Sequence, residues 1–82
     1  MLRYYFHVYD DDHSSDDEGV EFLNMRAAGV EAFRFAGDLI KAKAEQMLSG
    51  EPWHMEVKDQ EGLVIIRLDL KLSGFLLDAS AS

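Results

Sequence analysis

The chain has 82 residues, no cysteine and a formal net charge of −8. Its length allows one domain, predicted over residues 1–82, and the lack of thiols excludes disulfides, thiolate metal sites and a cysteine nucleophile. The acidic balance argues against nucleic acid as a partner, because neutralising phosphates requires clustered Lys and Arg. The first residues lack the pattern of a signal peptide and no window is apolar enough to span a membrane, so we expect no membrane association and a cytoplasmic location.

A strand is predicted over residues 2–9, where side chains alternate between two faces. The apolar set is the expected core face and consists of Leu2, Tyr4, Phe6 and Val8. The opposite set is free to meet solvent or a partner and consists of Arg3, Tyr5, His7 and Tyr9.

An acidic loop is predicted over residues 10–19, which contain no apolar side chain. We expect Gly19 to take a turn conformation at the end of this loop. Residues 20–22 then form a short strand that pairs back on the first strand as a wide hairpin.

One long helix is predicted over residues 25–48, with Asn24 as its N-cap and Ser49-Gly50 as its C-terminal stop. Apolar residues recur on one face at helical spacing. These are Met25, Ala28, Ala32, Phe35, Ala36, Leu39, Ile40 and Met47. Further apolar residues widen this arc beyond what one sheet contact requires, so we expect the helix to cover a curved sheet or to meet a second subunit.

A second hairpin is predicted from a strand at residues 53–58, a turn at 59–62 and a strand at 63–70. Alternation places Val64 on the core face and Ile65 on the free face of the last strand. The remaining residues hold an apolar triplet at 75–77, which is expected to dock on the body or on a partner. Residues 78–82 are expected to be frayed.

Together these elements predict an α+β fold, in which a three- or four-stranded antiparallel sheet packs on one long helix in the order β-(β)-α-β-β. The core face combines the apolar sets of the three longer strands.

The chain resembles a family of short bacterial proteins, common in rhizobia, that is classed as a domain of unknown function. The resemblance rests on the opening Arg-Tyr-Tyr-Phe-His-Val strand and on the Glu-Val-x-Asp-x-x-Gly hairpin at residues 56–62. It covers residues 3–70 and implies a small α+β domain with no assigned activity, so no catalytic residue can be transferred.

The acidic loop offers oxygen ligands at the spacing of a calcium-binding EF-hand loop. The candidates are Asp10, Asp12, Asp16, Glu18 and Glu21, with Ser14 at the remaining ligand position. The rest of the motif is missing, because Ser15 stands where a sharp turn requires glycine and a strand precedes the loop in place of a helix. We therefore expect a solvated loop and no bound cofactor.

Other chemistry has less support in the sequence. The histidines are His7, His13 and His54, and they lack the spacing of a zinc site. The serines lie in turns or loops without a nucleophile elbow or oxyanion motif. We expect no catalytic residue and no enzyme activity.

The best candidate for function is the free face of the sheet, which is aromatic and locally cationic on an acidic chain. Its residues are Arg3, Tyr5, His7, Tyr9, His54, Lys58 and Arg67. Tyr and Arg are enriched at the centres of protein interfaces. We predict a non-enzymatic protein-interaction domain that forms a homodimer or binds another protein. Two alternatives stay open: a small ligand- or cation-binding module, and an antitoxin-like acidic partner of a basic protein.

Overall fold

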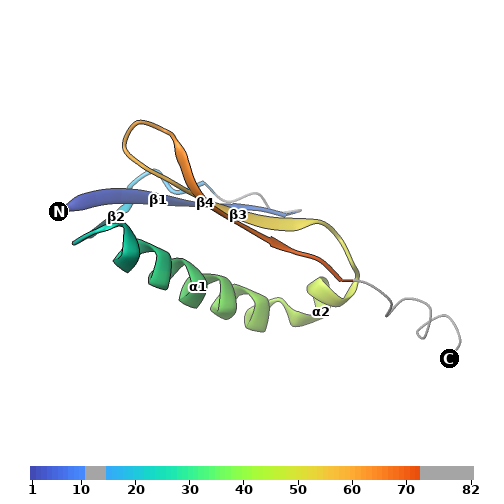
Figure 1. The fold of residues 1–82 in the computed structure, drawn as a ribbon. Helices are drawn as coiled ribbons and strands as arrows, with labels where there is room; N and C mark the ends of the chain where they lie inside the picture. The colour runs from blue at the N-terminus through green and yellow to red at the C-terminus, as the bar shows by residue number, and fades with distance from the viewer. Residues whose placement is uncertain (11–14, 73–82) are drawn as a thin grey trace, which may run out of the picture.

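The computed structural model describes residues 1–10 and 15–72. Four strands form one antiparallel sheet in the order β2-β1-β3-β4, and α1 lies against one of its faces (Figure 1). The elements are β1 (Leu2–Tyr9), β2 (Val20–Phe22), α1 (Met25–Ala42), α2 (Ala44–Leu48), β3 (Trp53–Lys58) and β4 (Val64–Leu70). The predicted α+β fold is confirmed. The predictions for Asp12, His13, Ser14 and residues 73–82 lie outside the described residues.

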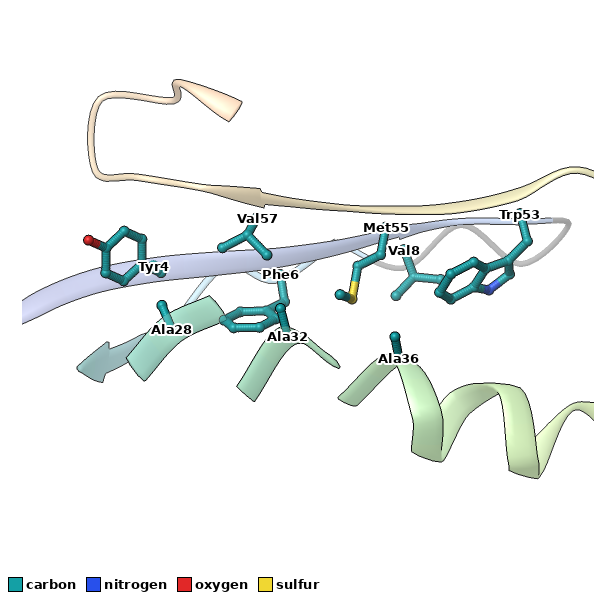
Figure 2. Packing of buried hydrophobic residues seen from close by; sticks show 9 residues of the cluster. All are labelled: Tyr4, Phe6, Val8, Ala28, Ala32, Ala36, Trp53, Met55 and Val57. Carbon is teal, nitrogen blue, oxygen red and sulfur yellow. The ribbon is translucent and has the colours of Figure 1, made fainter. Parts of the chain in front are cut away.

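The core is a layer of large side chains from the sheet against small ones from the helix (Figure 2). The helix contributes Ala28, Ala32 and Ala36, spaced one turn apart, so its backbone can come close to the sheet. The sheet contributes Tyr4, Phe6 and Val8 from β1 and Trp53, Met55 and Val57 from β3. The alternation read from the sequence is therefore confirmed for β3 and for β1 from Tyr4 onward. The prediction is wrong for Leu2, which is exposed at the start of β1.

Local signals mark the ends of the elements as expected. The Asn24 side chain accepts a hydrogen bond from the Ala27 amide at 2.9 Å and caps α1. Gly19 has a φ of 74°, which suits the turn that brings β2 back onto β1. In the hairpin between β3 and β4, the Asp59 carboxylate accepts from the amides of Glu61 and Leu63, each at 2.9 Å.

The predicted single helix is wrong at one point, because the helix breaks at Lys43, where φ is −113° and ψ is 32°. The Lys43 ammonium donates to the Asp10 carboxylate at 2.9 Å, which ties this point of the chain to the end of β1. After the break, α2 bends toward the sheet (Figure 1). Its Met47 side chain packs against the core.

The apolar arc of the helix is not fully covered. Met25, predicted to face the core, is exposed at the first helical position. Val30 and Phe33 are also exposed, which confirms the surplus apolar surface expected from the width of the arc.

A register shift corrects the predicted faces of β4. Val57 pairs with Ile66 and Lys58 pairs with Val64, so Ile65 has no partner on β3 between them. The extra residue of such a bulge resets the alternation. As a result Val64 is exposed and Ile65 packs against the core, the reverse of the prediction. From Ile66 onward the predicted faces hold.

Candidate interaction surface

The register gathers the seven predicted surface residues on the sheet face opposite α1. Tyr5 lies across from Lys58, and Tyr9 lies across from His54. Arg67 reaches the same face because it pairs with Glu56, which in turn pairs with His7. Arg3 lies at the other side of this face, across from Glu21 on β2.

Glu56 is the centre of this face. Its carboxylate lies 3.5 Å from the His54 ring nitrogen Nε2, 3.7 Å from the Arg67 guanidinium and 3.9 Å from the Lys58 ammonium. The Glu56 side chain is only 16% exposed, because its neighbours surround it. Much of the cationic character expected from the sequence is therefore balanced within the chain.

The remaining polar groups of the face also pair locally. The Arg67 guanidinium donates to both carboxylate oxygens of Asp69, with the shortest contact at 2.9 Å. This hydrogen bond lowers the pKa of Asp69 and raises the pKa of Arg67. The rings of Tyr9 and His54 stack with centroids 4.5 Å apart. A partner that binds this face must compete with these contacts.

Asp16 closes the edge of the sheet beside β1. Its carboxylate accepts hydrogen bonds from the backbone amides of Gly19, Phe6 and Glu18, at 2.9, 3.2 and 3.2 Å. Burial alone would raise the pKa of Asp16, but these three amides and the nearby His7 hold it below its usual value. Beyond the three residues of β2, this side chain takes the place of a pairing strand.

The other described carboxylates of the predicted calcium loop have different partners. Asp10 is 2% exposed at its side chain and bonds to Lys43, while Glu21 bonds to Arg3 at 2.7 Å. Glu18 is exposed, and its carbonyl accepts from Arg3. Within residues 1–10 and 15–72, no three His, Asp or Glu side chains are grouped to hold a metal ion. Calcium binding stays a hypothesis that titration would test.

An open hollow of about 390 Å³ lies between the closed edge of the sheet and α1. Its apolar wall comes from Phe6, Phe22, Phe35 and Val20. Its polar rim comes from Ser15, Asp16 and Glu31. The rings of Phe6 and Phe35 meet edge to face at 5.9 Å, so the wall is continuous with the core.

A second surface follows the flank of α1 that faces β4. A β-carbon on Gly29 would lie 3.5 Å from the end of the Ile66 side chain, which identifies this flank. Phe33 lies one turn further along it and is 67% exposed. The inner face of β4 beside it is only partly buried at Ile66, Leu68 and Leu70. The sequence showed the wide apolar arc but not which strand it borders.

Comparison with known families decides the affiliation of the chain. The family described as domain of unknown function DUF6894 matches residues 3–71. The chain belongs to the DUF6894 family. This DUF6894 match confirms the resemblance to a domain of unknown function over nearly the predicted range, and it does not bear on a rhizobial source or on individual motifs. No curated protein and no solved structure matches this DUF6894 domain.

No helix within the described part of this DUF6894 domain is long and apolar enough to cross a membrane.

Proposed function

We propose that this DUF6894 domain is a non-enzymatic protein-interaction module that binds a second copy of itself. The observation that carries the proposal is the uncovered apolar flank of α1, where Phe33 is exposed next to a strand whose inner face is half buried. Exposed apolar surface rimmed by polar groups marks interaction sites in soluble domains. A small domain also gains stability by burying such surface on association.

Two features support binding over catalysis. A general base or acid works best when its pKa lies near the working pH, whereas the pKa of Asp16 is lowered and its oxygens are occupied by amides. Glu56, on the sheet face opposite α1, lies near Arg67, and Asp10, at the end of β1, is paired with Lys43. These paired carboxylates are better suited to stabilising the fold than to transferring a proton.

The test is the mass of the chain by light scattering over a range of micromolar concentrations. We expect a dimer that dissociates on dilution. Phe33→Ser should raise the dissociation constant at least about tenfold, which corresponds to about 1.4 kcal/mol. Arg34→Ser is the matched control, because Arg34 is the exposed neighbour on the opposite flank and its variant should dimerise normally. A monomer at every concentration would contradict the proposal.

A second candidate function is small-ligand binding in the open hollow, favoured by its aromatic wall and acidic rim. Asp16 and Glu31 would select a ligand with an apolar body and a positive charge. A medium-chain alkylamine should then raise the melting temperature of the chain, and Glu31→Gln should remove that rise. An equal response to an uncharged alcohol of the same length would count against recognition by the carboxylates.

A further inference from the structure

The free edge of β4 carries a pattern that is complementary to itself. β4 is the last strand of the sheet among the described residues, so one side of its backbone has no strand beside it. Its sequence from Ile66 to Leu70 alternates apolar and charged residues, with Arg67 and Asp69 of opposite sign on either side of Leu68. Strand edges with unpaired backbone groups are templates for pairing with another chain.

The backbone groups that face this edge follow from the alternation of an antiparallel ladder. The Phe6 amide donates to Asp16, so it points away from β3. Because amides alternate sides along each strand, His7 and Glu56 bond to each other, and Met55 bonds to Leu68 on β4. The amides and carbonyls of Arg67 and Asp69 therefore point away from β3, toward the free edge.

From this placement we propose that two copies of the chain join by antiparallel pairing of their β4 strands, centred on Leu68. Leu68 then lies opposite Leu68 of the second copy, and Arg67 lies opposite Asp69 of the second copy. The inference rests on the proposed self-association and specifies the surface that performs it. The result is one continuous sheet of eight strands with both α1 helices on the same side.

The charges select this register over its neighbours. A shift that centres the pairing on Arg67 or on Asp69 places two like charges opposite each other, which is unfavourable. A shift by a single residue turns the apolar side chains of one copy to the polar face of the other. Charged residues often protect an edge strand from pairing, but here their opposite signs at a spacing of two residues match a second copy.

The apolar side chains of β4 favour the same register as the charged ones. In the proposed register Ile66 lies opposite Leu70 of the second copy. Both side chains are only partly buried in the single chain. The flank of α1 that carries Phe33 lies over the same edge, since the neighbouring Gly29 borders Ile66. Pairing the two edges therefore covers the partly buried face of β4 and the exposed ring of Phe33 together.

Disulfide formation between single engineered cysteines tests the register directly, because the chain has no cysteine of its own. Residues opposite each other in a pair without mutual backbone bonds have Cα atoms about 4.5 Å apart, which a disulfide can span. Leu68→Cys should form a disulfide-linked dimer under mild oxidation. Arg67→Cys and Asp69→Cys are the matched controls, because their equivalent atoms are offset diagonally by about 7–8 Å and should link poorly.

A charge exchange keeps the test decisive if Leu68→Cys does not fold. Arg67→Asp and Asp69→Arg should each be monomeric alone, since each places like charges opposite each other in the homodimer. Mixed together, they should form a heterodimer, because both cross-strand pairs then become complementary. Circular dichroism checks that each variant is folded before mixing.

The possible results distinguish the proposed β4 pairing from the broader proposal that the chain self-associates. Cross-linking strongest at Leu68 and a heterodimer on mixing support the proposed register. A dimer of the natural chain that links best at 67 or 69, or at none of the three positions, overturns this interface and leaves self-association standing. A natural chain that is monomeric throughout overturns both.

Discussion

At one edge of the sheet, the short β2 and the carboxylate of Asp16 occupy the outer backbone of β1. At the other edge, β4 runs for seven residues with an apolar inner face that is partly buried. Both β2 and β4 are edge strands, but β2 has only three residues and Asp16 caps the β1 backbone beyond it, whereas β4 presents seven residues with no described strand on one side. The β2 side is short and capped within the chain, and the longer β4 edge is the one that the proposed dimer would use.

The largest expected difference between the edges is in packing. Phe6 lies under the closed edge, where its ring contacts Phe22 and Phe35 at 6.0 and 5.9 Å between centroids. Phe6→Ala should lower the free energy of unfolding by about 3–5 kcal/mol. Leu68→Ala, at the open edge, should cost only about 1–2 kcal/mol because that side chain is half buried. Urea denaturation measures both.

His7→Ser is the control for Phe6→Ala, because His7 is the next residue on the same strand and points to the opposite face. It should change the free energy of unfolding by less than about 1 kcal/mol. Equal losses at the two positions would mean that the core face of β1 has been assigned wrongly.

The glycines beside the two edges give the next comparison. Gly19 and Gly62 have φ values of 74° and 84°, so alanine is strained at both. At Gly19 the new methyl group would also lie 2.9 Å from the Tyr4 carbonyl oxygen, whereas at Gly62 it would meet nothing within 4 Å. Gly19→Ala should cost about 2–4 kcal/mol and Gly62→Ala about 1–2 kcal/mol.

Thermal unfolding of the two glycine variants checks this order. Similar melting temperatures would show that β2 can move away from β1 at low cost, and that the closed edge is less rigid than its contacts indicate.

Asp16 tests how the closed edge is held. Asp16→Ala leaves three backbone amides without their acceptor and should cost about 1–3 kcal/mol. Asp17→Ala, the exposed neighbour, should cost less than about 0.5 kcal/mol. The free energies of unfolding at neutral pH give both values, and equal losses would count against the capping role.

The same carboxylate predicts a dependence on pH. Its pKa in the folded chain lies below the ordinary value of 3.8, so near that pH the unfolded chain binds more protons. The stability from Asp16 is therefore present above about pH 4 and is lost as the pH falls through the lowered pKa. Asp16→Ala should flatten the acid side of the stability profile, and an unchanged profile would contradict this assignment.

The smallest expected effect is on hydrogen exchange at the two edges. The Phe6 amide should be protected at every concentration, because Asp16 accepts its hydrogen bond within the chain. The amides of Arg67 and Asp69 should become protected only as the chain concentration rises. Exchange measured by nuclear magnetic resonance at two concentrations checks this, and protection independent of concentration would mean that the β4 edge is covered within a single chain.

The sequence determined the local parts of this structure. Alternation fixed the inner and outer faces of β1 and β3, Asn24 fixed the start of α1, and Gly19 fixed the return of β2. Each of these depends on residues within a few positions of one another, so a local pattern is sufficient. The seven candidate surface residues were found for the same reason.

Only the tertiary structure decided which residues distant in the sequence contact one another. The salt bridge of Lys43 with Asp10, the amides capped by Asp16 and the bulge at Ile65 each depend on contacts or pairing across the fold. In the sequence, Asp10 and Asp16 belong to one acidic run and cannot be told apart. Their different roles depend on partners that only the fold brings close. For the same reason, the apolar surplus of the helix could be seen in the sequence, whereas its position beside the open edge of β4 could not.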